Sequence, residues 1–223
     1  MRIEPFQASY PNFDFIASPD LFCAEAKNSF REFQANGLME ISPDPAFYVY
    51  RIETESRKHT GMIALNDVAD YFAGKIKKHE KTLSERERKQ MQLFQRWNAI
   101  LKPVLLTYPP VPEISRWLSH YADANKPLYS ARFAKDRQTH RVWAISDPAE
   151  ISHLQRLFSD HILCTYIADG HHRTTTAALL HERLKYQNQA ADFNHLFCAF
   201  FPADQLDILD YNRVVESAGL MNP

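Results

Sequence analysis

The scarcity of glycine is the feature that most constrains what this chain can fold into. Glycine supplies only 5 of the 223 residues, which is about a third of its usual share. A dinucleotide-binding fingerprint needs three glycines within six residues, and a P-loop needs two glycines followed by Lys and Ser or Thr. The glycines here are far apart, at positions 37, 61, 74, 170 and 219. Both Gly-rich phosphate loops are therefore excluded, and any phosphate site must use another kind of loop.

Length and charge are those of an ordinary globular protein. A chain of 223 residues predicts one domain, or one domain with a small appendage. Hydrophobic residues make up 45 % and charged residues 24 % of the chain, which is typical of a domain that buries a core. The formal net charge is −1, so we expect no nucleic-acid partner.

The cysteines and the apolar stretches point to the cytoplasm. Cys23, Cys164 and Cys198 are an odd number and lie far apart, so we expect buried, reduced thiols and no disulfide framework. The first residues lack the apolar region of a secretory signal. No stretch approaches the roughly 18 uninterrupted apolar residues of a membrane helix, so we expect a cytoplasmic protein without a membrane partner.

Helical and strand patterns alternate along the chain, which predicts an α+β protein with a mixed sheet and flanking helices. Apolar spacing and capping residues predict helices over 19–35, 66–72 with Asn66 as its cap, 84–101, 114–121, 147–158 and 174–185. Runs of β-branched and aromatic residues predict strands over 47–52, 60–65, 103–107, 129–133, 141–145, 164–168, 195–201 and 211–215. The strands over 129–133 and 141–145 are expected to form a hairpin.

The segment from Asp169 to Thr176 is the strongest candidate for a functional site. It reads Asp-Gly-His-His-Arg followed by three threonines, between a predicted strand and a predicted helix. The first turn of a helix offers free N–H groups and a positive dipole end, which attract phosphate. Gly170 permits a tight turn, and Asp169 suits a Mg²⁺ ion or a substrate hydroxyl. The plainer alternative is that Asp169 caps the helix and the histidines are surface residues.

A second candidate is the pair His79-Glu80, which on its own is a weak signal. His-Glu begins a metalloprotease motif, but Leu83 stands where the second histidine belongs, so a zinc protease is not expected. Alone, this pair is typical of a solvated surface ahead of a capped helix.

Together the two segments resemble known families. The chain resembles the family called domain of unknown function 1015 over roughly residues 45–215. The motifs that carry this resemblance are Phe-Tyr-Val-Tyr-Arg at 47–51, Thr-Gly-Met-Ile at 60–63, His-Glu-Lys-Thr at 79–82, Ala-Asp-Gly-His-His-Arg at 168–173 and Leu-Asp-Tyr-Asn-Arg-Val-Val at 209–215. Residues 76–83, 101–106 and 166–173 are also similar to the core of the archaeal free serine kinases, which belong to the ParB/sulfiredoxin-like superfamily.

The resemblance implies a domain organisation. It implies an N-terminal helical segment, residues 1–45, packed on the core. It then implies a ParB/sulfiredoxin-like core, residues 46–215, with an inserted hairpin and helices, and a tail, residues 216–223. The insertion lies between 106 and 166, where the kinases have a short connection. We expect it to reshape the acceptor pocket.

The resemblance also implies a kinase with ATP or ADP and Mg²⁺ as cofactors and a small-molecule hydroxyl compound as substrate. Glu80 matches the catalytic glutamate, in the role of general base, and Asp169 matches an active-site aspartate and a Mg²⁺ ligand. The phosphate-binding turn matches Gly170, His171, His172 and Arg173. Thr174 follows as an expected nucleotide contact, where the kinases have an aromatic residue. His79 and Arg51 are candidate substrate-binding residues; Arg51 alternates with aromatics on a strand, so it faces either solvent or a pocket.

Two other interpretations remain open. One is a non-catalytic ParB-like module that binds a nucleotide for regulation. The other is a hydrolytic metal site, since mixed nitrogen and oxygen ligands suit zinc or manganese. Its candidate ligands are His79, Glu80, Asp169, His171 and His172.

Overall fold

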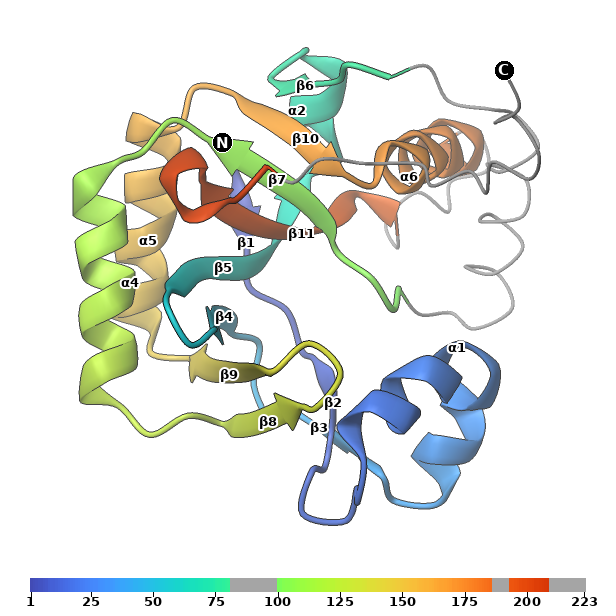
Figure 1. Cartoon of the computed structure of the whole chain (residues 1–223). Coiled ribbons are helices and arrows are strands. Elements are labelled where there is room, and N and C mark those ends of the chain that lie inside the picture. Colours follow the sequence, from blue (N-terminus) through green and yellow to red (C-terminus); the bar gives the residue numbers. More distant parts are fainter. Residues whose placement is uncertain (81–99, 186–192, 209–223) are drawn as a thin grey trace, which may run out of the picture.

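The fold is α+β, built on one mixed sheet of nine strands (Figure 1). This computed structural model describes residues 1–80, 100–185 and 193–208, apart from the side chain of Lys27. The strands of the main sheet are β1 (Ile3–Glu4), β4 (Phe47–Glu53), β5 (Lys58–Asp67), β6 (Ile76–Lys77), β7 (Val104–Tyr108), β8 (Tyr129–Phe133), β9 (Gln138–Ile145), β10 (Thr165–Asp169) and β11 (His195–Pro202). The predicted fold class, a mixed sheet with flanking helices, is confirmed.

The strand order is β6-β10-β7-β11-β5-β4-β9-β8, and β1 pairs with β5 beside this path. β6 pairs with β10 and β7 pairs with β11 in parallel, whereas the other neighbours are antiparallel. The predicted hairpin is present as β8 and β9. The sheet therefore has its parallel pairs toward the β6 end and two adjacent antiparallel hairpins, β4–β5 and β8–β9, toward the β8 end.

Three of the helices in the described part of the chain begin with a proline. They are α1 (Pro19–Ala35), α2 (Val68–Phe72), α4 (Pro112–Ala124), α5 (Pro148–His161) and α6 (His171–Lys185), followed by a short 3₁₀ turn, η2 (Ala203–Gln205). Proline stands at the start of α1, α4 and α5, where its missing N–H costs no hydrogen bond and its fixed φ suits a helix. No helix in the described part of the chain is long and apolar enough to cross a membrane.

The sheet has two unlike faces. Successive residues of a strand point to opposite sides, so Phe47 and Val49 of β4 lie on one face and Tyr48 and Tyr50 on the other. Phe47 and Val49 belong to the main core, together with buried side chains of α4 and α5, and Figure 1 shows these two helices beside each other along the sheet. Tyr48 belongs to a smaller cluster that Tyr50 packs against.

The N-terminal 45 residues contain the predicted helix and also three short strands. β2 (Ser9–Pro11) and β3 (Met39–Ile41) form a sheet of their own, and β1 joins the main sheet. α1 is tied to the hairpin, because the Asp20 carboxylate accepts a hydrogen bond of 2.9 Å from Ala134 N. The alternation that marks a strand needs more than two or three residues to be recognised, which explains why the sequence predicts only the helix here.

Some sequence expectations fall outside the described residues. These are the helix over 84–101, except for its last two residues, the strand over 211–215 and the tail over 216–223. The expectation of buried cysteines is wrong in part: Cys198 is buried, but Cys164 is half-buried and Cys23 is exposed, and all three are free.

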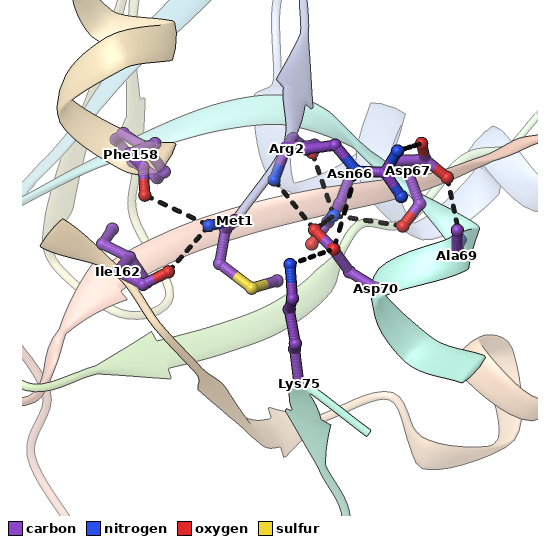
Figure 2. A network of polar contacts seen from close by, with 9 residues as sticks. All are labelled: Met1, Arg2, Asn66, Asp67, Ala69, Asp70, Lys75, Phe158 and Ile162. Atoms are coloured by element: carbon purple, nitrogen blue, oxygen red, sulfur yellow. Dashed lines mark hydrogen bonds and ion pairs between the residues drawn. The ribbon is translucent and has the colours of Figure 1, made fainter. Parts of the chain in front are cut away.

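The cap of α2 lies one residue later than expected. The side chain of Asp67 caps the helix by accepting a hydrogen bond of 2.8 Å from Ala69 N (Figure 2). Asn66 is fully buried instead, and its amide donates to Arg2 O at 3.0 Å and to Asp70 Oδ2 at 3.1 Å. At its C-terminal end, β5 extends two residues beyond the predicted strand. Asn66 therefore points into the core, and Asp67 stands at the start of the helix.

The neighbouring N-terminal amine joins β1 to α5. The ammonium group of Met1 donates to Phe158 O at 3.1 Å and to Ile162 O at 2.7 Å, as Figure 2 shows. These carbonyls belong to the last turn of α5 and its cap, where a helix carries unpaired acceptors and a partial negative charge. Burial lowers the pKa of this amine from its ordinary value of 8.0, and Asp70 partly opposes that effect.

Asp70 is the buried charge that holds this corner together. Its side chain is 1 % exposed and accepts from Arg2 N at 2.8 Å, while Lys75 Nζ lies 3.0 Å from Oδ1. Burial alone raises the pKa of a carboxyl group. Here the hydrogen bonds from Arg2 N, Lys75 and Asn66 outweigh burial, so the pKa of Asp70 lies below its ordinary value of 3.8.

We expect Asp70→Asn to destabilise the protein by about 3 kcal/mol at pH 7, because it removes one partner of a buried ionic network. A carboxyl group with a lowered pKa stabilises the fold above its unfolded pKa, and this stabilisation is lost as the pH falls through the folded pKa. The variant should therefore also lose less stability than the wild type between pH 5 and pH 2. Urea unfolding at several pH values measures both effects. Asp136→Asn, at an exposed carboxylate, is the matched control, and equal stability of the two variants would contradict the prediction.

Candidate functional site

The strand-to-helix turn at Gly170 organises the candidate site. Gly170 has φ +103°, a conformation that L side chains rarely adopt, so glycine is required here. α6 begins at His171, three residues earlier than the sequence predicts. The Gly170 carbonyl accepts from Thr174 N at 2.9 Å and closes the first helical turn. His171, His172 and Arg173 are therefore the first residues of the helix, where N–H groups have no partner inside the helix.

An irregularity in β10 comes directly before this turn. Ile167 pairs with Leu106 and Asp169 pairs with Leu105, so one extra residue is inserted in β10. Such bulges re-aim the side chains that follow them. Asp169 ends the strand with its side chain 74 % exposed, at the mouth of the turn.

Parallel pairing brings the His79-Glu80 pair to the same place. Thr165 of β10 lies opposite Ile76 of β6, and Thr165 N donates to Lys75 O at 2.9 Å. Parallel strands end at the same edge of a sheet, so the residues that follow β6 lie beside those that follow β10. The two segments are about 90 residues apart in the sequence, and the register of β6 with β10 brings them together.

The result is a cluster of His79, Glu80 and His171. One ligand-type atom from each lies within 4.8 Å of the others. Glu80 Oε2 is 3.6 Å from His171 Nδ1, and His79 N donates to His171 Nε2 over 3.5 Å. The two imidazole rings meet edge to face, with centroids 4.4 Å apart. His79 and Glu80 are exposed, whereas the His171 side chain is 6 % exposed.

The surroundings favour a neutral His171. Burial lowers the pKa of this imidazole below its ordinary value of 6.5, and the nearby His79 lowers it further. Glu80 and Asp169 oppose the shift without reversing it. At neutral pH, His171 is therefore an uncharged donor and acceptor at the start of α6.

Arg173 is fixed between the turn and the neighbouring strand. Its Nη1 donates to Pro103 O at 2.6 Å, and its Nη2 donates to Asp169 Oδ2 at 2.5 Å. The Arg173 side chain is 14 % exposed. The structure thus joins the two charged residues of the predicted turn to each other, and Arg173 holds the exposed carboxylate in place.

Two other residues of the predicted turn face inward. Thr174 is fully buried, and its hydroxyl donates to Gly170 O at 3.1 Å, so this hydroxyl stabilises the helix start. His172 is half-buried, and its buried Nδ1 has no hydrogen-bond partner among the described residues. Of the threonines, Thr174 and Thr176 are fully buried, which places them under the site rather than at its surface.

Arg51 lies elsewhere. It is on β4, separated from β10 in the sheet by β5, β11 and β7. Its Nε donates to Thr60 Oγ1 at 3.1 Å and its Nη1 to Asp123 Oδ1 at 2.7 Å, and its guanidinium lies over the ring of Trp143 at 5.4 Å. Arg51 therefore connects the sheet to α4, and the structure does not bring it to the start of α6.

The sequence analysis missed a cavity on the other face of the sheet. It has a volume of about 830 Å³ and is bounded by α1, β4, β5, β8, β9 and β11. It extends to Pro103, whose carbonyl Arg173 binds, and to Ala177, one turn further along α6. The sequence signal for this cavity is the alternation Phe-Tyr-Val-Tyr at 47–50. The sequence does not show where α1 lies, so these aromatic residues are expected in the core and not around a cavity.

The structure therefore has an α+β fold, and one edge of its sheet brings a His-Glu pair to the first turn of a helix. The chain belongs to the family described as protein of unknown function (DUF1015), whose model matches residues 9–222. No curated protein matches the chain, and no solved structure matches it.

We expect Gly170→Ala to destabilise the protein by about 3 kcal/mol, the upper end of the cost of a strained backbone conformation. The new methyl group would also lie 3.0 Å from Arg173 Nη2 and push it from Asp169. Gly37→Ala is the matched control, because Gly37 also has a positive φ, +71°, but has open space around it, so its cost should be about 1 kcal/mol. Chemical denaturation measures both values, and an equal cost at the two glycines would show that the turn is not constrained as described.

Proposed function

We propose that this protein is a small-molecule kinase, which transfers a phosphoryl group from ATP or ADP to a hydroxyl acceptor. The observation that supports it most is the meeting of Glu80 and His171 at the start of α6, with Arg173 and Asp169 beside them. The likeness of residues 76–83, 101–106 and 166–173 to free serine kinases supports the same reading, and with it a ParB/sulfiredoxin-like core. Phosphoryl transfer needs positioning and charge stabilisation more than covalent chemistry, and these residue types supply both.

Each residue has a role in this proposal. The N–H groups of the first turn of α6 bind phosphate oxygens, and Arg173 adds positive charge next to them. Glu80, which is exposed, accepts the proton of the acceptor hydroxyl. The hydroxyl oxygen then forms the new bond to phosphorus as the bond from phosphorus to the leaving nucleotide oxygen breaks. Neutral His171, whose Nδ1 lies 3.6 Å from the Glu80 carboxylate, borders and positions it, and His79 borders the acceptor.

A nucleotide brings Mg²⁺ to such a site, where the ion neutralises charge on the phosphates. Asp169 is the proposed ligand, because it is exposed and lies at the mouth of the turn. Arg173 contacts its Oδ2, so we assign the ion to Oδ1.

The test is phosphorus NMR of the protein with ATP or ADP, Mg²⁺ and a panel of hydroxyl compounds, in which a new phosphomonoester signal identifies the acceptor. We expect Glu80→Gln and Asp169→Asn to slow transfer by at least about 100-fold, the usual contribution of general-base catalysis. Glu113→Gln is the matched control for Glu80, since Glu113 is exposed and also lies 3.6 Å from a histidine nitrogen, that of His161. Full activity in both site variants would refute the assigned roles.

Calorimetry beside the NMR experiment addresses the regulatory alternative. If calorimetry shows that nucleotide binds but the NMR spectra show that no acceptor is phosphorylated, the protein is a nucleotide-binding module, and the kinase proposal fails.

The cluster of His79, Glu80 and His171 favours a metal centre as a second candidate function. Two ligands about 2.1 Å from a tetrahedral ion lie about 3.4 Å apart, and the distance between Glu80 Oε2 and His171 Nδ1 is 3.6 Å. Two imidazoles and one carboxylate suit zinc or manganese, and three protein ligands leave positions for water or substrate. Asp169 is not in this cluster, since it pairs with Arg173.

If this second candidate is right, protein dialysed against Zn²⁺ should retain about one equivalent by mass spectrometric metal analysis, since three ligands form one site. His171→Ala should then lose most of it. His161→Ala, which removes a histidine that also faces a glutamate, should retain it. Metal content that is the same in all three proteins, or absent from the wild type, would leave the cluster as a polar contact between neutral His171 and Glu80 with no metal.

A further inference from the structure

The cavity under α1 is lined by aromatic rings from two directions. α1 contributes Phe22, Phe30 and Phe33, and these side chains are less than a tenth exposed. The sheet contributes Tyr48 and Tyr50 of β4 from below. The volume of about 830 Å³ falls within the range of small-molecule pockets, roughly 300–1,000 Å³.

The described part of the cavity wall lacks carboxylate, ammonium and guanidinium groups. Among the described residues that line it, none is Asp, Glu, Lys or Arg. Burial raises the pKa of Tyr50 to about 12 and lowers the pKa of His140, so both are neutral at physiological pH. A charged occupant would lose its hydration without finding a counter-ion in this described part of the wall, which disfavours a free zwitterionic amino acid or a nucleotide phosphate there.

A polar pair interrupts the aromatic wall. Tyr50 Oη lies 2.5 Å from His140 Nδ1, and both residues line the cavity. With the phenol donating to Nδ1, the tyrosine oxygen keeps a free lone pair and the imidazole keeps a proton on Nε2. The pair therefore offers one acceptor and one donor in a largely aromatic wall, which also contains polar side chains such as Gln7 and Ser9.

The aromatic rings next to the β8–β9 hairpin pack against one another in the cavity wall. Tyr10 and Tyr129 stack at 5.9 Å with an interplanar angle of 21°, and Phe13 packs against Tyr129 at 5.3 Å. Offset stacks of this kind extend readily to one more ring. The described wall thus selects for flat, uncharged rings over branched aliphatic chains.

From this lining we infer that the cavity binds an uncharged aromatic compound that carries a hydroxyl group, with its ring among the aromatic side chains and its hydroxyl on the Tyr50–His140 pair. The site is distinct from the cluster at the start of α6, although Pro103 borders both. The inference does not depend on the kinase proposal, because binding is measured without nucleotide.

The probe for this inference is 2-(2-naphthyl)ethanol, with 2-ethylnaphthalene as the same ring system without the hydroxyl. Calorimetry or saturation-transfer NMR on the whole chain should detect binding of the alcohol. Ala26→Trp places an indole into the cavity from α1, because Ala26 lines it. The affinity should fall at least about tenfold, a loss that one displaced ring readily causes.

The matched control is Ala24→Trp, two residues away on the same helix and exposed, outside the cavity wall. It should bind the alcohol as the wild type does. Circular dichroism of both variants shows whether α1 is retained. Equal affinity in the two tryptophan variants, or no binding by the wild type, would overturn the inference.

Tyr50→Phe tests the polar pair separately. The variant should bind the alcohol no better than 2-ethylnaphthalene, and its affinity for the hydrocarbon should be that of the wild type. If the preference for the alcohol survives, the hydroxyl is bound elsewhere and this assignment is wrong.

Discussion

The parallel pairing of β6 with β10 is the constraint on which the candidate site depends. β6 has only two residues, and its register places Ile76 opposite Thr165 and Lys77 opposite Tyr166. That register carries His79 and Glu80 to the start of α6, where His171 is buried. A shift by one residue would turn the side chains of β6 to the opposite faces. A two-residue strand at the edge of the sheet therefore decides which residues of the candidate site meet.

The start of α6 shows how a chain with five glycines builds a strand-to-helix turn around a single one of them, Gly170. Gly170, with its positive φ, makes the turn. The side chains around it, and not further glycines, hold the turn in place. Arg173 supplies charge and is anchored to Pro103 O and Asp169. Thr174 closes the first turn from inside. Each of these side chains has a defined hydrogen-bond partner.

The two faces of the sheet have different uses. One is filled by α4 and α5 and contains the fully buried core. The other faces α1 across an aromatic cavity. The charged network of Asp70 fastens β1, α2 and the strand that leads into the site, so the corner that contains the first residues of the chain also positions β6.

The sequence by itself determined much of the local structure: the helices that start at Pro19 and Pro148, a helix around Ile114 to Tyr121, the longer strands, and the polar turn around Gly170. These follow from spacing, capping and φ preferences, which act over a few residues. Only the tertiary structure decided which of the predicted site residues meet. It joined His79 and Glu80 to His171, turned Thr174 inward, paired Asp169 with Arg173, and placed Arg51 against α4. The physical reason is that strand register and the packing of α1 depend on contacts between residues far apart in the chain, which no local pattern encodes.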